Sequence, residues 1–210
     1  MRKSPATEIA QATLPPAPGA ERYRSLDFAD TAATLPGDQS YDVLATPESA
    51  RHWLVTGDLA TPDVRLYEMC SQRMRTLRAH VRNLFAARVD DAPVPEESLR
   101  AVNEALTALP TAPLLAREGA TGLRRVQAHP TDQAVNHALA TLAADAADLL
   151  TGPDADLLAA CGSAPCDRFL LRTHGRRHWC STRCGGRASS AADAPASRTA
   201  PRPSGRGAVV

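Results

Sequence analysis

Apolar side chains recur at three- and four-residue steps along the longest periodic stretch of the chain. They are Tyr67, Cys70, Met74, Leu77, Val81, Leu84 and Phe85. Because an α-helix turns once in about 3.6 residues, this spacing predicts a helix through residue 88 or so with one apolar face. Thr61 and Pro62, a capping residue followed by a proline suited to the first helical turn, predict where that helix begins.

Shorter stretches of the same pattern predict further helices. A helix is expected over 47–56, where Thr46 can cap it and Trp53 and Leu54 face inward. Two more are marked by Leu99, Val102, Leu106 and Leu109, and, over about 132–150, by Val135, Leu139, Leu142, Ala146 and Leu149. Pro153 is expected to start a short last helix that runs into Cys161. Residues 113–129 carry two short apolar pieces around a glycine-containing turn, which predicts a small β-hairpin.

The composition agrees with a mainly α protein. Hydrophobic residues make up 43% of the 210-residue chain, enough for a core, but aromatic residues make up only 4%, which argues against an aromatic-rich β-barrel. Residues 1–20 are rich in Pro, Ala and Thr, and residues 188–210 have almost no large apolar side chain. We therefore expect both ends to be disordered.

The charge is distributed unevenly along the chain. The net charge is only +1, yet residues 161–210 hold nine arginines against two aspartates, whereas residues 1–160 hold 15 basic and 21 acidic residues. An acidic body with a basic end indicates a polyanionic partner for that end.

Export and membrane signals are not found in the sequence. Arg2 and Lys3 are followed by polar residues and prolines instead of an apolar segment, and nowhere do 18 consecutive apolar residues occur. We therefore expect a cytoplasmic protein with no membrane partner, in which thiols stay reduced.

Four of the five cysteines fall within 24 residues, in the spacing C-x4-C-x13-C-x3-C. They are Cys161, Cys166, Cys180 and Cys184. Two close pairs joined by a short loop suit a tetrahedral zinc site in which four thiolates leave no open position for substrate. Such a site is structural, and its binding energy can substitute for the core that this segment lacks. The sequence therefore predicts one structural Zn2+.

Other interpretations of these cysteines remain open at this point. Two disulfides would need an oxidising compartment, and the thiols could also be unrelated buried residues. His174 or His178, inside the loop, could replace one cysteine as ligand. Cys70, on the apolar face of the long helix, is expected to be a core residue.

Arginine and histidine side chains surround the cysteine cluster. They are Arg168, Arg172, His174, Arg176, Arg177, His178, Arg183 and Arg187. A zinc-stapled unit with this many guanidinium groups is typical of nucleic-acid binding, since arginine contacts phosphates and base edges. The alternative is that the arginines reflect compositional bias and solubility. Trp179 is expected to pack on the zinc knuckle and not to stack on a base.

The end of this segment resembles a known zinc finger. Cys161-x4-Cys166-x2-Phe169, followed by Arg176-Arg177-His178-Trp179-Cys180-Ser181-x2-Cys184-Gly185-Gly186-Arg187, is similar to the CGNR zinc finger. That finger typically follows an ABATE domain. Leu26-Asp27-Phe28-Ala29-Asp30-Thr31 resembles the opening L-D-F-x-N-T of this domain, and Thr46-Pro47-Glu48 with Trp53-Leu54 resembles its next segment. The likeness covers about residues 22–187.

The resemblance implies a helical domain followed by a zinc finger, in a family described as stress-induced transcriptional regulators of bacteria. It places zinc on the four clustered cysteines, and it implies DNA contacts at Arg176, Arg177 and Arg187, to which we add Arg183. The chain departs from the family pattern: Gly186 and Asp30 each stand where the family has Asn, and Leu171 where it has an acidic residue. The loop between the cysteine pairs is one residue short, and the basic helix after the motif is replaced by residues 188–193.

Other polar patterns give weaker signals. Arg75, Arg78 and Arg82 form a stripe beside the apolar face of the long helix, which could bind an anionic effector but is expected to be solvated or salt-bridged. Asp27 and Asp30 are expected to act at a helix start rather than in acid–base chemistry. No G-x-G-x-x-G, P-loop, G-x-S-x-G or H-E-x-x-H motif occurs, so we predict no catalytic residues and no enzyme.

The resulting fold prediction is mainly α, with a disordered lead over 1–20, a helical ABATE-like domain over 21–157, a four-cysteine zinc finger over 158–187 and a disordered tail over 188–210.

The predicted function is DNA-binding transcriptional control, in which the helical domain senses a ligand of unknown identity or forms a homodimer. A pocket lined by Trp53, Tyr67 or Arg78 would support the sensing role. The alternative is a protein- or RNA-interaction module in which zinc is purely structural. A zinc or thiol enzyme would need an open coordination position or a reactive thiol, which four close thiolates disfavour.

Overall fold

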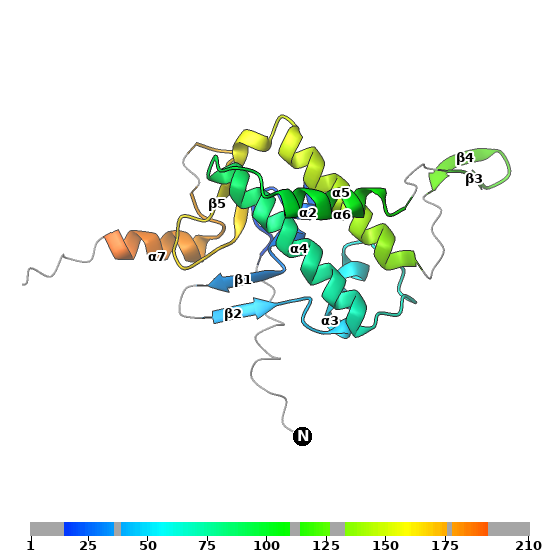
Figure 1. Cartoon of the computed structure of the whole chain (residues 1–210), viewed down its shortest axis with the longest axis horizontal. Helices are drawn as coiled ribbons and strands as arrows, with labels where there is room; N and C mark the ends of the chain where they lie inside the picture. Colours follow the sequence, from blue (N-terminus) through cyan, green and yellow to red (C-terminus); the bar gives the residue numbers. More distant parts are fainter. Residues whose placement is uncertain (1–14, 36–38, 110–113, 127–132, 176–177, 193–210) are drawn as a thin grey trace, which may run out of the picture.

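The computed structural model describes residues 15–35, 39–109, 114–126, 133–175 and 178–192, and this part of the chain is mainly α-helical (Figure 1). Its α-helices are α2 (Arg24–Ala29), α3 (Pro47–Thr56), α4 (Glu68–Val89), α5 (Glu96–Thr107), α6 (Ala134–Thr151) and α7 (Thr182–Ala192). Its strands form antiparallel pairs: β1 (Ala32–Leu35) with β2 (Gln39–Asp42), β3 (Leu114–Glu118) with β4 (Gly122–Val126), and β5 (Leu158–Ala160) with β6 (Phe169–Leu171). None of the described helices is both long and apolar enough to cross a bilayer.

The main core lies between α4 and α6, which pack on each other, on α2 and on α5. The fully buried side chains at its centre include Phe28, Met74, Val81, Phe85, Leu142 and Leu149. The apolar face predicted for the long helix is thus the face that α4 buries. Phe85 also contacts Phe169 of β6 edge to face, at 5.6 Å between ring centroids, so the core continues into the C-terminal strands.

The expected helix over 47–56 is confirmed as α3. Thr46 and Ser49 form a capping box, in which the Thr46 side chain accepts a hydrogen bond from the Ser49 N–H and Ser49 bonds the Thr46 N–H in return. Leu54 is fully buried, and Trp53 packs against the core while its Nε1 donates to Asp27 at 3.0 Å.

The predicted start of the long helix was wrong by six residues, since the residue before the helix is Tyr67 and not Thr61. The segment from Thr61 runs in turns and extended backbone, and α4 begins only at Glu68. Val64 is buried in this conformation, and the Arg51 side chain binds the carbonyl oxygens of Val64 and Pro62. Tyr67 consequently precedes the helix and is 66% exposed instead of lying on its apolar face.

The expected last helix from Pro153 was also wrong. Only Ala155–Leu157 form a 3-10 turn, and the chain then extends as β5. The reason is pairing across the fold: Leu158 lies opposite Leu171 of β6, and both are buried. The β5–β6 and β1–β2 hairpins have strands of three or four residues, too short for a periodicity argument to detect.

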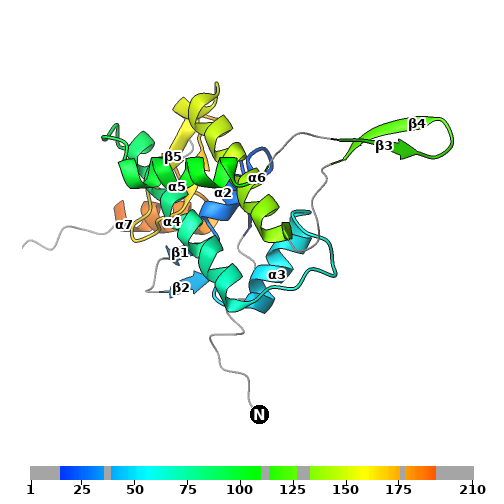
Figure 2. The same cartoon turned by 45° about the vertical axis from the view of Figure 1, so that its right-hand side comes forward.

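The predicted hairpin within 113–129 is confirmed as β3–β4, which projects away from the helices (Figures 1 and 2). Leu115 and Leu123 are each 70% exposed on it. Its register places Arg117 opposite Leu123 and Leu115 opposite Arg125.

The boundaries of the two expected disordered ends need correction where the structure describes them. Residues 15–20 form a turn in which Ala17 is buried and the Pro18 carbonyl accepts a hydrogen bond from Leu171 N–H at 2.7 Å. Gly19 has φ +97 and approaches Leu171 so closely that an added Cβ would lie 2.5 Å from its side chain. At the other end, α7 continues to Ala192, past the boundary expected at 187. Residues 1–14 and 193–210 lie outside the described residues.

Candidate metal centre

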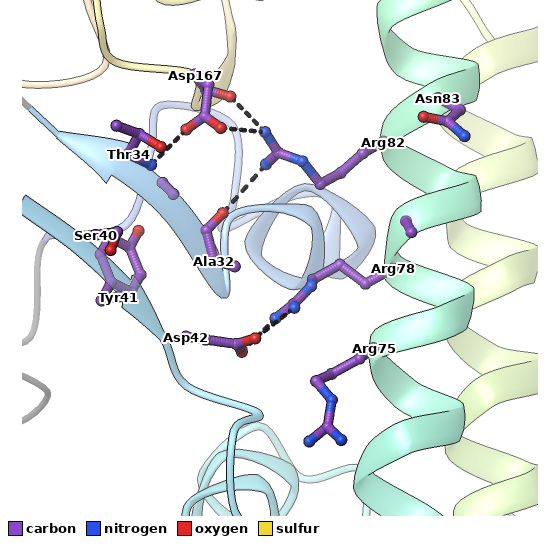
Figure 3. Close-up of a pocket in the computed structure, with 12 residues that line it drawn as sticks. Ala32, Thr34, Ser40, Tyr41, Asp42, Arg75, Arg78, Arg82, Asn83 and Asp167 are labelled. Carbon is purple, nitrogen blue, oxygen red and sulfur yellow. Dashed lines mark hydrogen bonds and ion pairs between the residues drawn. The ribbon is translucent and has the colours of Figure 1, made fainter.

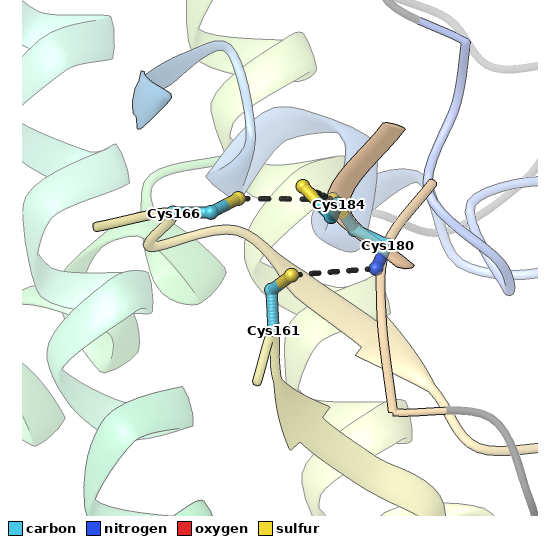
Figure 4. Close-up of side chains that lie close together, drawn as sticks. All are labelled: Cys161, Cys166, Cys180 and Cys184. Carbon is cyan, nitrogen blue, oxygen red and sulfur yellow. Dashed lines mark hydrogen bonds between the residues drawn. The ribbon is translucent and has the colours of Figure 1, made fainter. Parts of the chain in front are cut away.

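Two local structures bring the four clustered cysteines together (Figure 4). Cys161 directly follows β5 and Cys166 shortly precedes β6, so the β5–β6 loop presents the first pair. Cys180 precedes α7 and Cys184 lies in its first turn, where the Cys184 N–H donates to Ser181 Oγ at 3.2 Å. The pairing of β5 with β6 and the start of α7 thus position the four cysteine side chains.

The sulfur positions fit one tetrahedrally bound ion. All four thiols are buried, and their Sγ atoms lie within 4.8 Å of one another. Cys180 Sγ is 3.7 Å from Cys166 Sγ and 3.7 Å from Cys184 Sγ. A Zn–S distance of about 2.3 Å gives a tetrahedron with sulfurs about 3.8 Å apart, which agrees with these separations. The chemistry also fits, since zinc prefers thiolates and a set of four leaves no open position.

The alternatives considered from the sequence do not match this geometry. The structure joins none of the five cysteines by a disulfide. Within the described residues the metal-binding cluster consists of the four cysteines alone, and His174 and His178 are exposed outside it. Cys70 is half-buried on α4 and packs against the main core, as expected for a core residue.

The thiols of Cys161, Cys166 and Cys180 shift one another's pKa values. Hydrogen bonds with the Cys166 and Cys180 thiols lower the pKa of Cys161. The same contacts with Cys161 raise the pKa values of Cys166 and Cys180. A bound Zn2+ would offset the repulsion between thiolates, so its binding would release protons and add to folding stability.

The cysteines lie in a small second core that includes parts of the N-terminal segment. Ala17, Leu35 of β1 and Leu170 of β6 are buried there with the four thiols, and Tyr41 and Trp179 pack against them. Trp179 therefore packs on the zinc knuckle, as predicted, and lies against Gly185, where an added Cβ would be 3.2 Å from the indole ring.

The described arginines near the cluster differ in their exposure to solvent. Arg183 and Arg187 are exposed on α7, and Arg172 is exposed after β6. Arg168, which the sequence analysis counted with this basic surface, is instead buried and ion-paired with Asp30. Arg176 and Arg177 lie outside the described residues.

Asp30 and Arg168 form a buried connection between the helical domain and the cluster. Burial raises the pKa of the Asp30 carboxyl to about 7, and the charge of Arg168 is the largest effect that opposes this rise. Sequence reasoning missed both roles, because 138 residues separate the partners. The available signal was Asp30 itself, an acidic residue at a position where the resembled motif carries a neutral Asn.

The arginine stripe of α4 is salt-bridged, as expected, and Figure 3 shows the ion pairs of Arg78 and Arg82. Arg78 binds Asp42 of β2 through two hydrogen bonds of 2.6 and 2.7 Å. Arg82 pairs with Asp167 at 3.1 Å, and Arg75 with Glu68 at 2.8 Å. The pairs of Arg78 and Arg82 join α4 to the β1–β2 hairpin and to the finger. Glu68 lies on α4 itself, but Arg75 also donates to the Leu44 and Ala45 carbonyls after β2.

A cavity of about 570 Å³ opens between the same elements. All three stripe arginines line it, together with Tyr41, Asp42 and Asp167. Of the side chains expected around a sensing pocket only Arg78 is present, because Trp53 packs on Phe28 and Tyr67 points to solvent before α4.

The fold and the cysteine site together define a mainly helical protein with a C-terminal four-cysteine zinc finger. The model of the ABATE family, described as "Putative stress-induced transcription regulator", matches residues 24–153. The model of the CGNR zinc finger matches residues 158–194. The chain therefore belongs to the ABATE family and carries a CGNR zinc finger, whose cofactor is one zinc ion. No curated protein matches the chain significantly.

Proposed function

We propose that the chain is a DNA-binding transcription regulator, in which the zinc finger contacts DNA and the helical domain senses a ligand or mediates dimerisation. The observation that carries this proposal is that the arginines on α7 are exposed and have no carboxylate partner among the described residues. Arg183 and Arg187 are exposed and four residues apart, so they share one face of the helix.

These two arginines differ from the stripe arginines of α4 in their partners. Arg183 contacts the Gln39 side-chain oxygen at 3.4 Å. Within the described part of the chain, neither Arg183 nor Arg187 has a carboxylate partner. Arg75, Arg78 and Arg82, by contrast, are each held by a carboxylate. A guanidinium without a carboxylate partner can bind a phosphate without first breaking an ion pair, and the counterion of that phosphate is then released. The finger therefore offers the charges that a polyanion needs.

In this proposal zinc has a structural role. The four thiolates hold the start of α7 against β5 and β6, and this fixes the direction of the helix that carries Arg183 and Arg187. Arg176 and Arg177 precede the second cysteine pair in the sequence and add two further charges to the same unit. The metal itself contacts no DNA.

The cavity beside α4 supports the sensing part of the proposal. It is bounded by the β1–β2 hairpin, by α4 and by Asp167, the residue that follows Cys166 in the finger. A small polar molecule bound there would contact the Arg82–Asp167 ion pair, which joins the helical domain to the finger. Homodimerisation is the alternative role of the helical domain, and light scattering of the purified chain distinguishes a dimer from a monomer.

DNA binding is tested with the zinc-loaded full chain and a mixed-sequence duplex, with fluorescence anisotropy recorded against salt concentration. We expect the affinity to fall steeply as salt rises, and the log–log slope to decrease by about one for each arginine whose phosphate contact is lost. Arg183→Gln and Arg187→Gln are the test variants, with Arg176→Gln and Arg177→Gln as a second pair. Arg100→Gln, which removes an exposed arginine of α5, is the matched control. A wild-type chain that does not bind DNA even at low salt would refute the proposal.

A protein- or RNA-interaction module is the second candidate, favoured by the β3–β4 hairpin. Leu115 and Leu123 are exposed there, and Arg117 lies opposite Leu123. Apolar side chains that remain in water add no stability to an isolated hairpin, whereas exposed apolar surface is typical of an interaction site. If DNA binding fails while the chain retains its zinc, this hairpin becomes the surface to examine with protein and RNA partners.

A further inference from the structure

The most deeply buried ion pair within the described residues joins the helical domain to the finger. The side chains of Asp30 and Arg168 are only 1% and 3% exposed, and Arg168 Nε donates to Asp30 Oδ2 at 3.0 Å. The other carboxylate oxygen, Oδ1, accepts the N–H of Phe169 at 2.9 Å. Asp30 follows α2, whereas Arg168 lies between Cys166 and β6, so this one carboxylate orients a side chain and a backbone amide of the finger.

The rest of the Arg168 guanidinium points at a candidate zinc ligand. Its Nη1 donates to Cys180 Sγ at 3.9 Å, and its Nη2 donates to the Pro15 carbonyl at 3.1 Å. Each nitrogen of the planar group therefore has its own acceptor: a carboxylate, a sulfur and a carbonyl. Arginine suits this arrangement, because a lysine ammonium is a compact charge that cannot reach three separated acceptors.

The positive charge of Arg168 can stabilise the thiolates at this position. Four thiolates around one Zn2+ leave the site with excess negative charge, and a hydrogen bond from a cation stabilises the sulfur that receives it. Groups that hydrogen-bond a metal ligand orient that ligand and tune the metal affinity. Asp30 in turn compensates the buried cation, which would otherwise be costly to keep in the apolar interior.

We infer that Arg168 is a positioning residue for the zinc ligand Cys180, and that Asp30 holds Arg168 in this role. The helical domain thereby sets part of the zinc affinity of the finger. This inference concerns the metal site alone and stands whether or not the chain binds DNA.

The surrounding contacts agree with a finger that depends on the helical domain. Leu35 of β1 and Ala17 complete the small core around the thiols. Asp167, next to Cys166, accepts the Thr34 N–H at 2.8 Å and also binds Arg82 of α4. In the part of the chain that the structure describes, the core and the hydrogen bonds around the cysteine cluster therefore include residues from outside the finger.

The test compares zinc affinity between full-length variants, measured by competition with a chromophoric chelator after circular dichroism has confirmed the fold. We expect Arg168→Gln to weaken zinc binding by about 10- to 100-fold. Arg168→Lys, which keeps the charge but not the planar geometry, should fall between this variant and the wild type. Asp30→Asn should weaken binding in the same direction, and the double variant should lose less than the product of the two single losses, since both act through one contact.

A spectroscopic readout separates positioning from mere stability. In the cobalt-substituted chain, loss of the hydrogen bond to Cys180 raises the energy of the sulfur lone pair, so the thiolate-to-cobalt absorption of Arg168→Gln should move to longer wavelength. Asp42→Asn is the matched control, because it breaks a half-buried Arg–Asp pair of the helical domain that does not contact the cysteines. Its zinc affinity and cobalt spectrum should be those of the wild type.

The inference is overturned if Arg168→Gln retains wild-type zinc affinity, or if it and Asp42→Asn change the affinity equally. Multiplicative losses for Asp30→Asn and Arg168→Gln would also overturn it, because they would show that the two residues act separately. If Arg168→Gln does not fold, Arg168→Lys and Asp30→Asn carry the test, and a wild-type cobalt spectrum with wild-type affinity in both refutes it.

Discussion

The Sγ atoms of Cys166 and Cys180 lie 3.7 Å apart, although the two residues come from opposite ends of the finger loop. This separation is far longer than an S–S bond of about 2.05 Å and close to the edge of a zinc–thiolate tetrahedron. Without a cation the buried thiols repel as they ionise, so metal loss should destabilise the finger. We predict one zinc ion per chain by mass spectrometry, and a lower melting temperature after treatment with a strong chelator.

Single cysteine substitutions test which thiols hold the metal. Cys184→Ser removes a buried ligand, so its zinc content should fall close to zero. Cys70→Ser is the control, because Cys70 is half-buried on α4 outside the cluster and should leave the zinc content unchanged. A purified chain that holds no zinc and melts at the same temperature with and without chelator would contradict the zinc assignment.

Acid should weaken the link between α4 and β2 through Asp42. Burial alone raises the pKa of this carboxyl, but the two hydrogen bonds from Arg78 outweigh burial, and the net pKa is lowered. A lowered folded-state pKa contributes stability that is present above the unfolded-state value of about 4 and is lost as the pH falls through the folded-state value. The wild type should therefore lose more stability than Asp42→Asn below about pH 4.

The difference in unfolding free energy between wild type and Asp42→Asn isolates this group from the other carboxyls and from acid release of zinc. Denaturant titrations at several pH values give that difference. It should shrink as the pH falls from 5 to 3, and a difference that stays constant over this range would show that the Arg78–Asp42 pair adds no stability.

Local patterns were sufficient to predict α3, most of α4, α6 and the β3–β4 hairpin. Thr46 and Pro47 gave an unambiguous start signal, whereas Thr61 and Pro62 gave an identical one where no helix begins. The difference is tertiary, since Val64 becomes buried in the extended segment and Arg51 binds its carbonyl. Capping signals alone cannot detect such a competing contact.

The metal site was more predictable than its surroundings. The cysteine spacing alone indicated the four ligands. Only four residues separate Cys161 from Cys166, and only three separate Cys180 from Cys184, so each short loop holds the two thiols of its pair close together. The contact from Arg168 to Cys180 depends on Asp30, and nothing in the sequence near either residue predicts that they meet. Buried arginines are rare unless paired, so Arg168 was counted with the exposed basic residues around it.

The main core and the projecting hairpin should respond very differently to loss of a leucine. Leu142 of α6 is fully buried, and Leu142→Ala should cost about 2–5 kcal/mol because it leaves a cavity between α4 and α6. Leu123 of β4 is 70% exposed, and Leu123→Asn should change the stability by less than about 0.5 kcal/mol. Denaturant unfolding measures both, and a large loss for Leu123→Asn would show that the hairpin packs on a surface in solution.

Two adjacent glycines at the start of α7 provide a test of how the finger helix packs. An added Cβ at Gly186 meets no heavy atom within 4 Å, whereas one at Gly185 lies 3.2 Å from the Trp179 ring. Either alanine substitution removes the helix cost of glycine, worth about 1 kcal/mol. Gly186→Ala should therefore raise the melting temperature of the zinc-loaded chain by about 2–4 °C, and Gly186→Asn, which restores the family's residue, by less.

Gly185→Ala should raise the melting temperature less than Gly186→Ala, or lower it, because the new methyl group displaces Trp179 from the zinc knuckle. The comparison is controlled internally, since both substitutions add the same group to neighbouring positions of one helix. Scanning calorimetry at a fixed excess of zinc measures the two shifts. Equal shifts would show that Trp179 moves without cost, and that its packing against Gly185 does not hold α7 in place.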